Sequence, residues 1–211
     1  MKNSKKTVLY MVEMALLIAL VVVLQVFGTA VKIGPLPMSL VLVPIVMGAC
    51  LLGVRAGGML GLIFGIVTAV MGIVGADGFS LMLFEARPVW FVILCLAKAT
   101  AAGLGAGLLY RALERPLGKK SKTLQTVLAC AIAPIINTGI FVLGMIFFYF
   151  DTLNALPSLY PDAFGGFNSG MQVLFFGLAG LNLVGEFVVS LVLSPVVVRV
   201  VDVVKNKLTR S

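Results

Sequence analysis

The sequence predicts an all-α integral membrane protein with six transmembrane helices. Its composition is the first observation: 61% of the 211 residues are hydrophobic and only 11% are charged. Soluble domains are about half apolar and a quarter charged. The second observation is the alternation of long apolar stretches with short polar or basic segments, at lengths that suit a bilayer. We therefore expect a single transmembrane domain over residues 1–211.

The six predicted spans cover about residues 7–28, 39–53, 57–75, 89–113, 123–150 and 171–204. A basic segment precedes the first, but its apolar run continues to Phe27 without a small-residue cleavage site, so we expect a span and not a removed leader. The second span is short, because at ~1.5 Å per residue it does not reach across a hydrocarbon core of ~30 Å. The connections after the third and fifth spans are expected to be long loops.

The distribution of lysine and arginine predicts that both termini are cytoplasmic. With the N-terminus inside, the outer loops hold only Lys32 and Arg87, and Lys98 lies within a span. All other basic residues fall inside, as the positive-inside rule requires. The net charge of +8 is thus explained by topology, and we expect no nucleic-acid partner.

The residue types argue against catalysis and against a cofactor. The chain has no histidine, no Cys-x-x-Cys pair and no glycine-rich nucleotide loop. A serine nucleophile with Lys98 as base is conceivable, but Ser190 and Ser194 lie nearer the cytoplasmic end of their span. We expect a protein that is not an enzyme and that holds neither metal nor cofactor.

Four polar side chains lie at membrane depth, where ionisable and amide groups are costly and often functional. They are Lys98, Asn137, Asn182 and Glu186. One interpretation is structural: Lys98 and Glu186 form an ion pair, or Asn137 bonds to Asn182 or Glu186. The other is a ligand pocket between the fourth, fifth and sixth spans, in which Lys98 faces an anionic group and the amides supply donors and acceptors.

The segment "PIINTGIF", residues 134–141, surrounds Asn137 with two helix-modifying residues. Pro134 frees a backbone group, and Gly139 is expected to admit a close neighbour. Glu85, Arg87 and Trp90, near the outer end of the fourth span, are further candidate ligand contacts. Trp90 is equally explained as an interfacial belt residue.

Small residues recur every fourth position on three spans. They are Gly57, Gly61, Gly65 and Ala69; Ala99, Gly103 and Gly107; and Ala15 and Ala19. Such faces allow close helix packing within the bundle. On the first span, the alternative is contact with a second membrane protein.

The order of several segments resembles the substrate-binding S components of energy-coupling factor (ECF) transporters. These segments are "ALLIA", "LPMSLVLVPIVMGACLLGVRAGGMLGLIFGIV" and "LAKATAAGLGAGLLYRALE". "PIINTGIF" and "LNLVGEF" are similar to those of a vitamin-uptake subgroup. The resemblance covers essentially the whole chain.

The resemblance implies a six-helix bundle in a prokaryotic plasma membrane that binds a water-soluble vitamin. Its partners would be a transmembrane coupling subunit and two cytosolic ATPases, with Ala15 and Ala19 docking onto the coupling subunit. Lys98, Asn137, Asn182 and Glu186 fall in the helices that enclose the substrate in this family. Pantothenate or riboflavin is favoured and folate also fits. The alternative is a stand-alone carrier that uses an ion gradient, with Glu186 as the coupling carboxylate.

Overall fold

The computed structural model describes residues 2–28, 32–33, 36–37, 40–117 and 121–210, and nearly all of them are helical. Long helices form the bundle: α1 (Lys2–Gly28), α3 (Val54–Ile73), α5 (Pro88–Leu117), α6 (Lys122–Phe148) and α10 (Gly180–Arg210). A short helix α9 (Gly170–Gln172) and a π-helical segment η2 (Val173–Ala179) lead directly into α10. Within the described residues, five helical stretches are long and apolar enough to span a membrane, so the all-helical membrane class is confirmed.

The second predicted span is much shorter in the structure than the long helices of the bundle. It forms α2 (Leu42–Leu52), an 11-residue apolar helix that is too short to cross a bilayer alone. The preceding segment contains an antiparallel pair of two-residue strands, β1 (Lys32–Ile33) and β2 (Leu36–Pro37). A sixth crossing that uses α2 therefore stays a prediction.

The two connections expected to be loops contain helices. The first holds α4 (Gly78–Ala86), which begins at Asp77, whose carboxylate accepts a hydrogen bond of 2.7 Å from the backbone N–H of Ser80. This is a favourable N-cap, because it satisfies an N–H that the first helical turn leaves unpaired. The second holds α7 (Phe150–Leu159) and α8 (Pro161–Phe164). Both expectations of loop structure are wrong.

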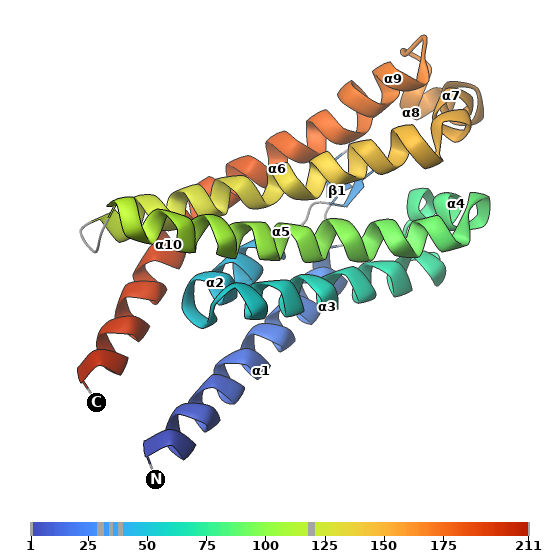
Figure 1. The fold of residues 1–211 in the computed structure, drawn as a ribbon. Coiled ribbons are helices and arrows are strands. Elements are labelled where there is room, and N and C mark those ends of the chain that lie inside the picture. Colours follow the sequence, from blue (N-terminus) through green and yellow to red (C-terminus); the bar gives the residue numbers. More distant parts are fainter. Residues whose placement is uncertain (1, 29–31, 34–35, 38–39, 118–120, 211) are drawn as a thin grey trace.

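Figure 1 shows α3, α5 and α6 running along the length of the molecule, with α1 and the C-terminal part of α10 inclined to them. The N-terminus of α1 and the C-terminus of α10 lie at one end of the molecule. Helices α4, α7, α8 and α9 gather at the opposite end. The two termini thus share an end, as an even number of crossings would produce.

The small-residue faces of α3 and α5 pack directly against each other. A methyl group built on Gly61 would collide with the carbonyl oxygen of Ala99. One built on Gly57 would lie 2.6 Å from the carbonyl oxygen of Gly103, and one on Gly65 2.7 Å from that of Cys95. The bundle-packing interpretation of these two faces is confirmed. We call this contact the α3–α5 seam.

The end of α4 is fastened to the end of α6. Tyr149 is fully buried, and its hydroxyl donates hydrogen bonds of 3.2 Å to the Leu83 carbonyl and 2.9 Å to the Arg87 carbonyl. The orientation of α4 over the bundle is therefore held by its C-terminal end.

Candidate functional site

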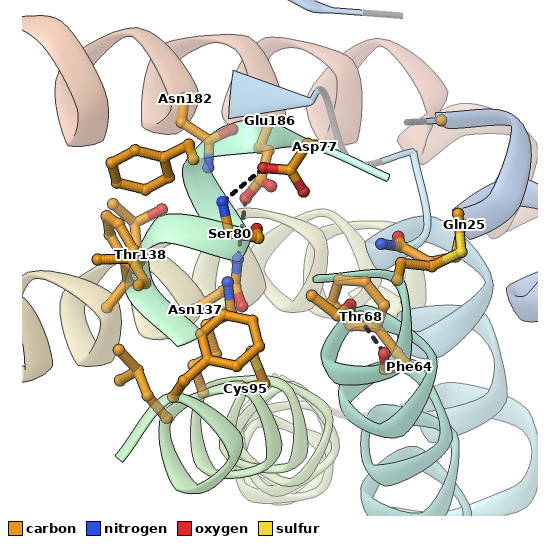
Figure 2. A pocket seen from close by; sticks show the side chains of 18 residues that line it. Gln25, Phe64, Thr68, Asp77, Ser80, Cys95, Asn137, Thr138, Asn182 and Glu186 are labelled. Atoms are coloured by element: carbon orange, nitrogen blue, oxygen red, sulfur yellow. Dashed lines mark hydrogen bonds between the residues drawn. The ribbon is translucent and has the colours of Figure 1, made fainter. Parts of the chain in front are cut away.

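A cavity opens between the long helices, and α4 covers part of it. It has a volume of ≈ 80 Å³. Its lining comes from α1, α3, α4, α5, α6 and α10 and combines polar groups with aromatic rings: Gln25, Gly28, Phe64, Thr68, Met71, Asp77, Phe79, Ser80, Leu83, Phe91, Leu94, Cys95, Lys98, Asn137, Thr138, Phe141, Asn182 and Glu186. Figure 2 shows Asn137, Thr138, Asn182 and Glu186 on one side, with Gln25 and Thr68 on the other. All four polar residues predicted at membrane depth line this cavity.

Asn137 and Glu186 are joined by a buried hydrogen bond. The Asn137 amide nitrogen donates to a carboxylate oxygen of Glu186 at 3.2 Å, and both residues are almost fully buried, at 3% and 2% exposure. A carboxylate only accepts hydrogen bonds, so this pairing fixes which way the amide points. One structural interpretation of Asn137, a bond to Glu186, is thus present. This bond uses the side-chain nitrogen of Asn137 and not its side-chain oxygen.

The other half of the Asn137 amide, its side-chain oxygen, has no hydrogen-bond partner among the residues that the structure describes. Its side-chain oxygen is buried and unpaired, and so is the hydroxyl oxygen of the next residue, Thr138. An unsatisfied buried polar group costs roughly 1–3 kcal/mol, so most such groups in proteins have partners. Both residues line the cavity, so these two groups are candidates for hydrogen bonds to a bound molecule.

Lys98 is partly buried and does not form the ion pair with Glu186 considered from the sequence. Of the residues that the structure describes, no carboxylate pairs with its ammonium group. The Lys98 Nζ lies 5.3 Å from the ring centroid of Phe141, a cation–π arrangement. The cavity therefore contains a cation that is available to a ligand.

The segment around Asn137 also corrects one expectation. Pro134 lies inside α6 as predicted. Gly139, however, has no neighbouring atom within 4 Å of a built methyl group. It faces away from close helix contacts, so it does not serve to admit a neighbour.

Three predicted contacts lie away from the cavity. Glu85 and Arg87 are exposed, and neither lines it. Trp90 is 39% exposed and stacks on Phe148 with ring centroids 3.8 Å apart. The reason is the folding of α4: its N-terminal end covers the cavity, whereas these residues lie at or beyond its C-terminal end.

Two cavity residues were missed because their chain segments were interpreted differently. Asp77 lies in the connection after the third span, which was expected to be a loop, but the α4 cap buries its side chain to 5% exposure beside the cavity. Gln25 lies near the end of α1 and is also buried. The pattern Asp77-x-x-Ser80 is an N-cap pattern that could have revealed α4. No local pattern indicates that α1 and α3 contribute to the site.

The comparison with known families agrees with this geometry. The family described as "ECF transporter, substrate-specific component" matches residues 9–198, which is most of the chain. The chain belongs to this family. The resemblance drawn from the sequence is thereby confirmed. No curated protein and no solved structure gives a significant match.

Membership defines the general role of the molecule. An ECF substrate-specific component is the substrate-binding membrane subunit of a transporter, and it works with ECF membrane and ATPase modules. Such a subunit is not itself an enzyme.

Proposed function

We propose that this ECF substrate-specific component binds a water-soluble vitamin in the cavity between α5, α6 and α10. The observation that carries the proposal is the orphaned side-chain oxygen of Asn137, buried at 3% exposure on the cavity wall. Lys98, Asn182 and Glu186 add a cation, an amide and a carboxylate around the same space. Aromatic and aliphatic side chains complete a lining of the kind that binds small molecules.

Pantothenate and riboflavin are the favoured vitamins, and folate also fits. Each carries carbonyl or carboxylate oxygens that suit the Lys98 ammonium. Each also carries hydroxyl or N–H groups that can pair with Asn137 and Asn182. The volume of ≈ 80 Å³ is below the roughly 300–1,000 Å³ of ligand pockets, so the cavity widens when a vitamin enters.

We place the protein in a prokaryotic plasma membrane with both termini in the cytoplasm and α2 completing a sixth crossing. The concentration of basic residues on the inner segments supports this orientation. The shared end of the two termini in Figure 1 is consistent with it. The α4 end of the molecule then faces outward, where substrate arrives.

We further propose that α1 docks onto the membrane coupling subunit of a module that contains two cytosolic ATPases. Ala15 and Ala19 are exposed on α1, whereas Met14, Leu17 and Val21 on another face of the helix are buried in the bundle. A small-residue face open to the membrane allows another helix to approach closely. Substitution there should therefore affect transport without affecting the cavity.

Ala15→Trp is expected to leave ligand affinity unchanged and to abolish uptake. Leu16→Trp is a matched control, because Leu16 is 66% exposed on a different face of the same helix. Ligand titration of the purified variants and uptake in cells that express the full transporter measure the two effects. Normal uptake by Ala15→Trp would contradict docking through this face.

The vitamin itself is best identified from the purified protein. Mass spectrometry of the small molecule that remains bound after purification should reveal a water-soluble vitamin, and titration should confirm that it binds the ligand-free protein. Uptake should require the ATPase partners. Uptake by this chain alone, driven by an ion gradient and lost in Glu186→Gln, would support the stand-alone carrier instead.

A further inference from the structure

Helix α1 is attached to the bundle along one narrow stripe of side chains. In its most apolar stretch, 17% of the α1 residues are buried, against 50% in α3. The buried positions of its membrane-spanning part recur every three or four residues, which places them on one side of the helix. They are Met14, Leu17, Val21, Gln25 and Gly28. The position of α1 therefore depends on few contacts.

The character of this stripe changes where it reaches the cavity. Met14, Leu17 and Val21 belong to an apolar cluster with side chains of α2 and α3. Gln25 and Gly28 line the cavity instead. Gln25 is 7% exposed, and a buried amide is costly unless its donors and its acceptor form hydrogen bonds. An amide at this point of an apolar stripe is explained if it binds a polar ligand.

We propose that Gln25 binds the ligand from α1, and that a filled cavity thereby strengthens the docking of α1 onto the coupling subunit. This inference rests on the proposed function, because it requires both a vitamin in the cavity and a partner on α1. It assigns a further ligand-binding residue to a site that was proposed from α5, α6 and α10. Figure 2 shows Gln25 across the cavity from Asn137 and Glu186, so a ligand between them joins α1 to the opposite wall.

The ligand-binding end and the docking face belong to one continuous helix. Gln25 follows Ala19 at a distance of about 9 Å along α1. Ala15 and Ala19 are exposed, whereas Gln25 is buried, so the partner and the ligand contact different faces. A ligand bonded to Gln25 adds a contact to a helix that has few, and it holds that helix in place before the partner docks. Because the cost of ordering α1 arises only once, each binding event favours the other.

Thr68 offers a matched comparison on the same side of the cavity. It lines the cavity from α3, and its hydroxyl donates a hydrogen bond of 2.9 Å to the Phe64 carbonyl in its own helix. Its oxygen can still accept a hydrogen bond from a ligand. Helix α3, however, is packed against α5 at the α3–α5 seam and carries no proposed docking face. Removing the Thr68 hydroxyl should therefore leave the link between ligand and partner unchanged.

The test compares vitamin binding to the purified full-length protein alone and in complex with its coupling module, in nanodiscs without ATP. The probe is each of pantothenate, riboflavin and folate that binds the ligand-free protein. The wild-type complex should bind it about 5- to 150-fold more tightly than the free subunit does, the range typical of coupled sites. The module should bind the vitamin-loaded subunit more tightly by the same factor, because coupling between two sites is reciprocal.

Two variants locate the effect. Gln25→Met removes the amide but keeps a side chain of similar length that suits the apolar stripe. It should weaken vitamin binding to the free subunit about tenfold or more and bring the ratio of the two affinities close to one. Thr68→Val should keep the wild-type ratio, whatever its effect on affinity, because valine has the shape of threonine. A purely structural role for Gln25 would leave the ratio unchanged in both variants.

The outcomes separate this inference from the function on which it rests. Equal vitamin affinity of the free and the complexed wild-type protein overturns the coupling and leaves vitamin binding intact, and this measurement does not depend on the folding of any variant. An unchanged ratio in Gln25→Met, or an equal loss of the ratio in Thr68→Val, overturns the assignment to Gln25. If none of the three vitamins binds and none is retained on purification, the proposed function fails and the inference fails with it.

Discussion

The two sides of helix α5 differ sharply, although the residues that form them alternate along one segment. Ala99 and Gly103 meet glycines of α3 so closely that backbone touches backbone. Lys98, one residue before Ala99, faces the cavity and has no carboxylate partner among the described residues. The side of α5 that faces α3 is closely packed. The other side faces a cavity whose lining includes unpaired polar groups.

This difference separates a structural surface from a functional one. Within lipid there is little hydrophobic drive between helices, so their association depends on close packing, which small residues permit. The α3–α5 seam meets that requirement. On the cavity side, an unpaired amide oxygen and hydroxyl lower stability. Substitutions on the two sides should accordingly affect different measurements.

The largest effect is expected at the α3–α5 seam. Gly61→Ala places a methyl group on the Ala99 carbonyl, where neither backbone can move easily. Overpacking of this kind costs about 1–3 kcal/mol or more, so the yield of folded protein and its thermal stability should fall. Gly139→Ala is the matched control in α6, because its new methyl group has no neighbour within 4 Å. Equal stability of the two variants would show that the seam is not tightly packed.

A smaller and more selective effect is expected in the cavity. Asn137→Ala removes the unpaired oxygen and the donor to Glu186, so ligand affinity should fall about tenfold or more while expression holds. Ile135→Ala is the control, since Ile135 is 46% exposed on the outer surface of α6. Calorimetric titration of both variants measures the difference. Unchanged affinity in Asn137→Ala would remove this residue from the binding site.

The smallest effect is expected at Trp90, which lies in the first turn of α5 and does not line the cavity. Trp90→Leu loses the stack on Phe148, which is worth roughly 0.5–1.5 kcal/mol beyond area burial. Stability should drop slightly, and ligand affinity should stay the same in the titration used for Asn137. A clear loss of affinity would restore Trp90 to the ligand-binding surface and would show that the bound form differs here.

The sequence predicted the parts of the fold and site that depend on local composition. Apolar length located the long helices, and the cost of polar groups in lipid singled out Lys98, Asn137, Asn182 and Glu186, which all line the cavity. Small-residue spacing predicted that these faces of α3 and α5 pack closely within the bundle, as they do at the α3–α5 seam. In each case, the physical cause acts within one segment or at a fixed depth.

The remaining features depend on how distant segments meet. Glu85 and Arg87 are as polar as Asp77, but only the N-terminal end of α4 covers the cavity, and tertiary packing decides which end that is. The sequence likewise leaves open whether Lys98 pairs with Glu186, because a helical face does not fix the distance between side chains on different helices. The contributions of α1 and α3 to the lining arise from the same long-range packing.

The α3–α5 seam has a mechanical consequence for substrate entry. Where backbone meets backbone, no side chain can rotate aside, and the interior there can neither be compressed nor sheared without breaking contacts. Helices α3 and α5 are therefore expected to move together, as one stiff wall of the cavity. Any expansion that the proposed substrate requires is therefore expected where α4, α6 and α10 line the cavity, and not at this seam.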